Sequence, residues 1–209
     1  LKFAEEIAKE KGNIDYSDKL KENAETACKS FVNKFMNEAG YLYDYIDGNY
    51  KDLNVRPNMI FAVSLPYSPL GKRQKKSVLD FVTKELLANC GLRTLSPKSD
   101  RFRPHYNGSE NDKKFAYFNG MAFPWLFGAY IEAYLNLFQL SGLSLAERII
   151  VNMENELQND CIGSISEFYD SNPPFIAHGG YSFAMSVAEL LRAKKIISSY
   201  NTENVDIKK

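Results

Sequence analysis

The sequence predicts an all-α fold whose long loops gather at one end. In several segments the apolar residues recur at steps of three and four, as they do on one face of a helix. Two long stretches between these segments are rich in turn-forming residues, and neither an array of strands nor a fixed-period repeat is visible. With 209 residues, 44% of them hydrophobic, the chain is long enough to bury one compact core.

The first long helix is predicted over residues 17–38, where apolar residues follow the helical spacing and Gly40 can end the run. Residues 1–12 begin inside an amphipathic helix and lack the apolar run and cleavage site of a secretory signal. We therefore expect the N-terminus to be a truncation. Residues 41–48 carry aromatic residues at alternate positions before Asp-Gly, which predicts an extended segment and a turn.

A short helix and a longer one are predicted next. Residues 56–70 are apolar between prolines, so we expect a short helix that begins through Pro57 and ends before Pro66. Residues 77–88 have the spacing of a longer helix. Residues 89–112 then lose all regular period, and a loop of this length in a compact domain is usually functional.

The remaining residues predict a helix pair, a second long loop and a final helix. Residues 119–140 and 143–157 form the pair, joined through Gly142. Residues 161–180 are rich in glycine, serine and proline, and residues 183–199 are amphipathic.

Charge and apolar patterning argue against nucleic acid and membrane as partners. The 26 basic side chains balance the 26 acidic ones, so no net field attracts a polyanion or an anionic membrane. Residues 121–138 are apolar and long enough for a membrane span, but Pro124, Glu132 and Asn136 interrupt them. Because a central glutamate costs on the order of 3 kcal/mol in lipid, we expect a buried helix instead.

The cysteines and histidines predict neither a metal nor a cofactor. Cys28, Cys90 and Cys161 are odd in number, far apart and without CxxC spacing, which favours reduced thiols and a cytoplasmic protein. His105 and His178 could act as acid or base, but each is isolated from a second histidine or cysteine. We interpret both as surface or loop residues.

Glu167 is the candidate for chemistry. It lies in CIGSISEFYD, where small residues precede it and aromatic residues follow. A carboxylate among aromatic rings can be tuned for proton transfer, and glycoside hydrolysis requires such carboxylates. Taken by itself, this pattern fits a helix-capping or solvent-exposed acid more often.

Several segments resemble, in order and spacing, the C-terminal catalytic domain of glycogen debranching enzymes, the amylo-α-1,6-glucosidases. That family is similar to the glucoamylases, which are (α/α)6 toroids. The resemblance implies that residues 1–209 are a single domain, the C-terminal half of such a toroid, with about six to seven helices and long loops at one end. The segments are RPNMIFAVSLPYSPL at 56–70, GLRTLSP at 91–97, DRF and YNG within 100–108, GSISEFYD at 163–170, and the closing G then SVAELLR at 179–192.

The resemblance also implies a role for Glu167. The glutamate of the family's S-x-S-E motif is the general base of an inverting hydrolysis of α-1,6-linked glucose, in which two carboxyl groups stand about 6.5–9.5 Å apart. No segment here corresponds to the partner acid, so this fragment is expected to be inactive alone. The implied partner is an α-glucan oligosaccharide such as glycogen limit dextrin. Half a toroid is also expected to self-associate or to pair with the missing N-terminal half.

Five further residues are candidates for binding the sugar. Arg93 and Arg103 could each present a forked pair of donors, with a structural ion pair to an aspartate as the alternative. Arg56 could hold a carboxylate at the pocket edge or form a salt bridge where a helix begins. Trp125 could stack on a sugar ring or pack in the core. Tyr117 begins the segment that matches the family's Y-H-x-G-T-V-W-P-W.

Departures from the family pattern favour two alternative functions. Phe118 and Phe123 replace the histidine and the first tryptophan of that motif, and Met121 also differs. In the closing segment Phe183 and Met185 replace the glutamine and tryptophan of Q-A-W-S. These changes favour a non-catalytic glycan-binding or regulatory module; a purely structural helical partner is the third interpretation.

Overall fold

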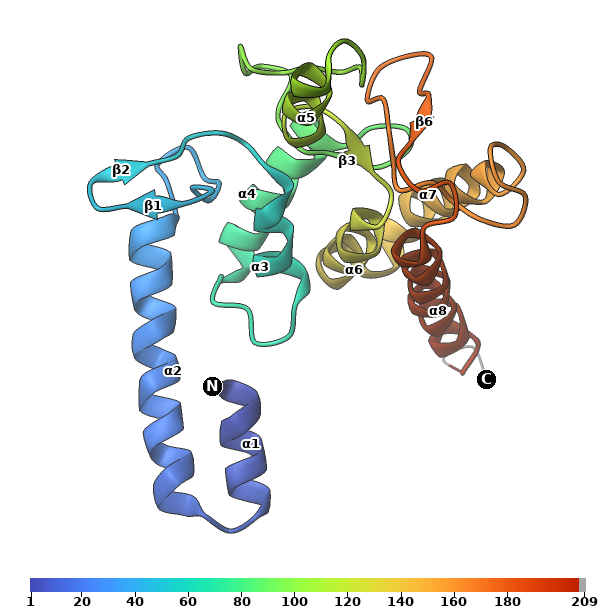
Figure 1. The fold of residues 1–209 in the computed structure, drawn as a ribbon. Coiled ribbons are helices and arrows are strands. Elements are labelled where there is room, and N and C mark those ends of the chain that lie inside the picture. Colours follow the sequence, from blue (N-terminus) through green and yellow to red (C-terminus); the bar gives the residue numbers. More distant parts are fainter. Residues whose placement is uncertain (207–209) are drawn as a thin grey trace.

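The computed structural model describes residues 1–206, with side chains up to residue 201, and this part of the chain is mostly helical. It contains eight α-helices and six strands of two residues each. In Figure 1 the hairpin of α1 (Lys2–Glu10) and α2 (Ile14–Phe35) projects from a body formed by the other helices. Long loops gather at one end of that body, around α5 (Glu110–Phe118). The predicted helical fold is confirmed.

The α1–α2 hairpin is held mainly by contacts between its own two helices. Asn13 caps α2, because its side chain accepts a hydrogen bond from the backbone N–H of Tyr16 at 3.3 Å. Ala8, Leu20 and Ala24 are buried along the hairpin. The C-terminal end of α2 packs against the main core through partly buried aromatic rings, among them Phe31 and Phe35.

The segment after α2 follows the predicted order of an extended stretch, a turn and a short helix. Strands β1 (Ile46–Asp47) and β2 (Tyr50–Lys51) pair antiparallel around Gly48, whose φ of 56° suits the turn. A 3-10 turn, η1 (Pro57–Met59), leads into α3 (Ile60–Ser64). Pro57 fits the first turn because it has no N–H to leave unpaired, and α3 ends before Pro66.

The next helix changes its winding before it ends. Helix α4 (Lys72–Phe81) runs directly into a π-helical turn, η2 (Val82–Leu86), and strand β3 (Leu92–Arg93) follows. Helix α5 begins at the end of the predicted loop, where the Ser109 side chain and Asp112 form a capping box.

The predicted helix over residues 119–140 is wrong at its start. Residues 122 and 123 instead form a strand, and helix begins only after Pro124. Proline restricts the residue before it to extended backbone, and Phe123 pairs with Leu92 of β3. The remaining elements are β4 (Ala122–Phe123), α6 (Leu126–Phe138), η3 (Gln139–Gly142), α7 (Leu143–Glu156), β5 (Phe168–Tyr169), β6 (Ala177–His178) and α8 (Ala184–Asp206).

Four of the short strands form one antiparallel sheet in the order β3-β4-β5-β6. Ala122 of β4 pairs with Tyr169 of β5, and Phe168 of β5 pairs with His178 of β6. Gly91 lets the backbones meet, because a Cβ there would lie 2.4 Å from the carbonyl carbon of Phe123. The sheet therefore joins both long loops to the N-terminal end of α6.

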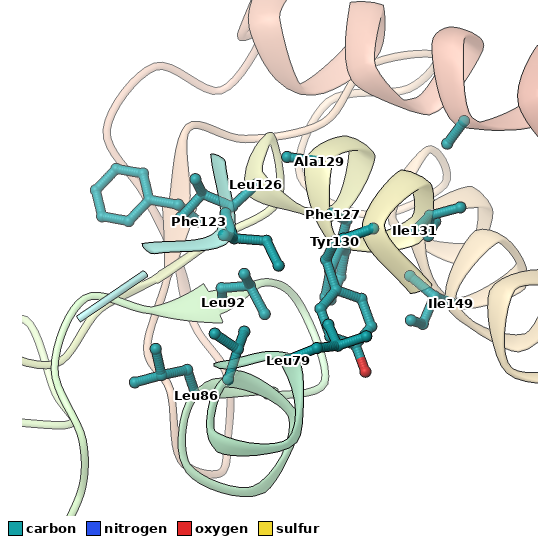
Figure 2. Close-up of a cluster of buried hydrophobic side chains, with 14 of the residues drawn as sticks. Leu79, Leu86, Leu92, Phe123, Leu126, Phe127, Ala129, Tyr130, Ile131 and Ile149 are labelled. Atoms are coloured by element: carbon teal, nitrogen blue, oxygen red, sulfur yellow. The ribbon is translucent and has the colours of Figure 1, made fainter. Parts of the chain in front are cut away.

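Helix α6 is the centre of the core. Phe127, Tyr130 and Ile131 are almost completely buried, and Figure 2 shows side chains of α4, η2 and β3 facing this helix. The Tyr130 hydroxyl lies 2.9 Å from the hydroxyl of Thr83. The apolar stretch is thus a buried helix, and in the described part of the chain no helix is long and apolar enough to cross a membrane.

Candidate functional site

Glu167 lies immediately before β5, and neutral donors orient both of its carboxylate oxygens. The Tyr117 hydroxyl donates to Oε1 at 3.0 Å, and the Gly180 N–H donates to Oε2 at 3.1 Å. The backbone N–H of Glu167 donates in turn to the Gly180 carbonyl at 2.9 Å. Its side chain forms no ion pair with the basic side chains described up to residue 201. Each carboxylate oxygen can therefore still accept a hydrogen bond from water.

Two glycines form the backbone cradle of this carboxylate. Gly179 has a φ of 75°, in the left-handed region that glycine adopts without strain. A Cβ on Gly179 would lie 2.5 Å from Oε2 of Glu167 and 2.8 Å from the Phe168 ring. The position therefore requires glycine for both backbone conformation and space.

Tyr117 is held in place by an aromatic cluster. It comes from the C-terminal end of α5, and its ring meets Phe168 and Phe123 edge to face at 5.0 and 5.1 Å. Burial, followed by the hydrogen bond to the Glu167 carboxylate, raises the pKa of Tyr117 to about 12. The hydroxyl therefore stays protonated at neutral pH and remains a donor to Glu167.

An open depression of about 570 Å³ adjoins this pair. Glu167 is not among the residues that line the depression, but Tyr117 lines it and donates a hydrogen bond to Glu167. Aromatic rings with polar edges beside charged groups suit the apolar faces and hydroxyl rims of sugars. Its lining residues are Tyr106, Glu110, Lys113, Lys114, Tyr117 and Phe118.

A model of the amylo-alpha-1,6-glucosidase family matches residues 1–192. The chain belongs to this family. Glycogen debranching enzyme from Saccharomyces cerevisiae is 28% identical to it over 91 residues, which is 41% of this chain and 6% of the yeast protein. The chain thus spans a small part of the curated relative that it matches.

The fold comparison agrees with a partial toroid. Neutral trehalase Nth1 from Saccharomyces cerevisiae superimposes with a TM-score of 0.59 at 16% identity. The match covers 88% of this chain and 33% of the trehalase chain. At this identity the likeness concerns the fold alone, and this chain has the fold of part of an (α/α)6 toroid.

Of the predicted sugar-binding residues, only Tyr117 contacts Glu167 directly. Arg56 donates to the Phe118 carbonyl at 2.6 Å and to the Thr94 carbonyl at 3.1 Å, and its Nε lies 3.7 Å from the Asp44 carboxylate. Arg56 thus braces the end of α5 next to Tyr117.

The other three predicted residues contact the protein itself. Arg93 donates to the carbonyls of Leu87 and Ser171 at 2.8 and 3.2 Å, and burial lowers its pKa. Exposed Arg103 donates to backbone carbonyls of its own loop. Trp125 is partly buried at the start of α6 and stacks on Phe61 at 5.9 Å.

The positions that depart from the family pattern fall into different environments. Phe123 is buried beneath Tyr117, whereas Phe118 is 56% exposed at the rim of the depression. Met185 is exposed on α8, and the Phe183 N–H donates to the Ile165 carbonyl in the Glu167 loop.

Asp170 is the residue that sequence reasoning missed. Its carboxylate is buried and lies within hydrogen-bond distance of both histidines, His105 at 3.1 Å and His178 at 2.8 Å. The two histidines do lie in or beside the long loops, but sequence reasoning did not connect them, and the structure shows that they share one carboxylate. One local signal was present in the sequence, because Asp170 follows Glu167 by three positions.

Proposed function

We propose that residues 1–209 form one domain, the C-terminal part of the catalytic toroid of a glycogen-debranching amylo-α-1,6-glucosidase, with Glu167 as general base. The observation that carries this proposal is the orientation of the Glu167 carboxylate by Tyr117 and Gly180, without an ion pair to any basic side chain among residues 1–201. A carboxylate held in this way can accept a proton from a water that attacks the anomeric carbon.

The reaction needs a second carboxyl group. In the inverting mechanism a general acid protonates the leaving oxygen while the base removes a proton from water on the opposite side of the sugar ring. We place that acid in the N-terminal part of the toroid, outside this chain. The chain by itself is then inactive, and its substrate in the complete protein is an α-glucan oligosaccharide such as glycogen limit dextrin.

Pairing with the N-terminal half of the toroid explains the exposed apolar surface of the α1–α2 hairpin. Phe3, Ile14 and Tyr16 are more than half exposed there. Two apolar depressions of about 370 and 490 Å³ lie beside α2 and share Phe31, Tyr67, Ser68 and Pro69. Self-association of this chain is the competing way to cover the same surface.

A cytoplasmic location completes the proposal. Cys28, Cys90 and Cys161 are all free thiols. Unpaired cysteines are typical of proteins kept in a reducing compartment.

The test is Glu167→Gln in the full-length parent protein, with Glu147→Gln as the matched control. Glu147 is exposed on α7, so the control removes the same charge away from the site. Glu167→Gln should abolish release of glucose from a branched dextrin and leave the Kd for a short isomalto-oligosaccharide within about threefold, because binding does not need the base. Normal hydrolysis by Glu167→Gln would show that the base is another residue.

The same assay tests the alternative, a non-catalytic glycan-binding or regulatory module. Five replacements favour it, since they put apolar groups where the family pattern has polar or stacking ones: Phe118, Met121, Phe123, Phe183 and Met185. If the unmodified full-length protein binds the oligosaccharide without hydrolysing branched dextrin, the module is correct and the enzyme proposal is not.

A further inference from the structure

The single buried carboxylate of Asp170 faces an unusually large number of hydrogen-bond donors. Its side chain is only 4% exposed, yet three donors from two loops converge on it. Oδ2 faces Nδ1 of His105 at 3.1 Å, and Oδ1 faces both Nε2 of His178 at 2.8 Å and the backbone N–H of Tyr106 at 2.9 Å. A carboxylate only accepts hydrogen bonds, so each facing ring nitrogen must carry a proton.

This geometry fixes a different ring nitrogen as the donor in each histidine. His105 is protonated at Nδ1 and His178 at Nε2, because those are the atoms that face Asp170. The arrangement does not form a metal site, since no group of three histidine, cysteine, aspartate or glutamate side chains in the described chain could hold a metal ion.

The contacts of Asp170 reach both sides of the Glu167 site. On one side, His178 belongs to β6, pairs with Phe168 and directly precedes the Gly179–Gly180 cradle. The neighbouring backbone reinforces this link, because the Asp170 N–H donates to the Ile176 carbonyl at 2.9 Å.

On the other side, Asp170 fixes the wall of the depression. Tyr106, whose N–H it accepts, lines the depression and packs against Phe168 and His178 at 5.0 Å each. The Ser171 N–H donates to the Pro104 carbonyl at 3.0 Å, which ties the same two loops together. The Asp170 carboxylate thus contacts both the residue before the Gly179–Gly180 cradle and the residue that lines the depression.

We propose that Asp170 is a positioning residue for Glu167, acting through His178 on the glycine cradle and through His105 and Tyr106 on the depression. The inference rests on the proposed function of Glu167 where catalysis is concerned. Its structural part, the paired tautomers, stands independently. Displacing a catalytic carboxylate by about 1 Å can lower the reaction rate on the order of a hundredfold, so the position of Glu167 matters for turnover.

The first experiment measures the tautomers in the 209-residue chain. His105 and His178 are its only two histidines, so ¹⁵N-histidine labelling yields two imidazoles, which His105→Asn assigns. At a pH high enough for the ¹⁵N spectrum to show both rings in their neutral forms, we expect one Nδ1–H and one Nε2–H form. In Asp170→Asn the amide nitrogen can only donate, so one imidazole must change tautomer or lose its partner. Two identical tautomers, or an Asp170→Asn spectrum equal to that of the unmodified chain, would overturn the proposed contacts of Asp170 with the two histidines.

The second experiment measures kinetics of the full-length parent. Asp170→Asn should lower kcat by roughly 10- to 100-fold with KM within about twofold, because a misplaced base affects the chemical step rather than binding. Asp18→Asn on the exposed face of α2 removes the same charge as a control. An unchanged kcat in Asp170→Asn while Glu167→Gln is inactive would overturn the positioning role and leave the proposed function intact. An active Glu167→Gln would overturn both, whatever the tautomers show.

A conservative pair separates positioning from general loss of folding. Glutamine places its amide nitrogen near the position of a histidine Nε2, so His178→Gln should keep kcat within about threefold of the unmodified protein. His178→Ala removes the donor and should lower kcat about as much as Asp170→Asn. Equal kcat values in the two His178 variants would contradict the proposal, even if Asp170→Asn proves too unstable to measure.

Discussion

Replacing Gly179 by alanine tests the glycine cradle of Glu167 directly. The left-handed φ of 75° costs an alanine about 1 kcal/mol. The new Cβ would also lie 2.5 Å from Oε2 of Glu167 and 2.8 Å from the ring of Phe168, which is 2% exposed. Overpacking of this kind costs about 1–3 kcal/mol, so Gly179→Ala should lower the free energy of unfolding by about 2–4 kcal/mol.

The chain supplies two matched controls. Gly163 has nearly the same φ, 79°, but a Cβ there would meet nothing within 4 Å, so Gly163→Ala isolates the backbone cost of about 1 kcal/mol. Gly180 follows Gly179 directly, and its Cβ would make only ordinary contacts at 3.8 and 3.9 Å. Gly180→Ala should therefore change stability by less than about 1 kcal/mol.

Urea denaturation followed by tryptophan fluorescence suits this comparison, because Trp125 is the only tryptophan and lies against the core. In the complete enzyme proposed above, Gly179→Ala should also lower kcat at least tenfold, because the clash displaces Oε2 from the Gly180 N–H. If Gly179→Ala and Gly163→Ala lower the free energy of unfolding equally, the predicted cost of crowding a Cβ against Glu167 and Phe168 is refuted.

Two further predictions concern tyrosine hydroxyls. Tyr117→Phe removes a hydrogen bond of 3.0 Å to a partly exposed carboxylate, so it should lower the free energy of unfolding, measured in urea, by about 1–2 kcal/mol. It should also lower kcat of the complete enzyme proposed above. If neither quantity changes, the hydrogen bond contributes to neither stability nor catalysis. Burial raises the pKa of Tyr130 to about 12, so its contribution to stability is complete below about pH 10, the ordinary pKa of tyrosine, and is lost as pH rises through about 12. Urea midpoints measured between pH 9 and 12, relative to Tyr130→Phe, should therefore fall more steeply for the unmodified chain.

Helical periodicity was a reliable guide wherever the amphipathic pattern was long. The helices predicted over residues 17–38, 143–157 and 183–199 appear close to those positions, whereas the one predicted over 77–88 begins earlier, at Lys72. These segments have one apolar face each, so local spacing alone determines which side is buried.

Sequence spacing could not reveal the small sheet. Each strand has only two residues, too few for an alternating pattern, and Phe123 belongs to an apolar run that continues into α6. The strand state of residues 122 and 123 depends on Leu92 and Tyr169, which are distant in sequence. Tertiary pairing here overrides the local preference for helix.

In the candidate site too, sequence reasoning identified what is local and missed what depends on residues far apart in the sequence. Glu167 could be selected from its motif, because the residues that mark it are adjacent in sequence. Asp170 could not be connected to His105, because the pair is 65 positions apart and only the fold brings them together. Likewise Tyr117 and Glu167 are 50 positions apart, so their hydrogen bond was beyond any local pattern.

The sheet β3-β4-β5-β6 has a consequence for the order in which this protein acquires its structure. Helices such as α7 form from neighbouring residues, whereas the sheet requires the ends of two long loops to meet, and closing long loops is entropically slow. We therefore expect the carboxylate cradle beside β5 and β6 to assemble later than the helices. Partial opening of the native state should begin there, and a bound sugar that bridges these loops would protect the site from proteases more than it protects the helices.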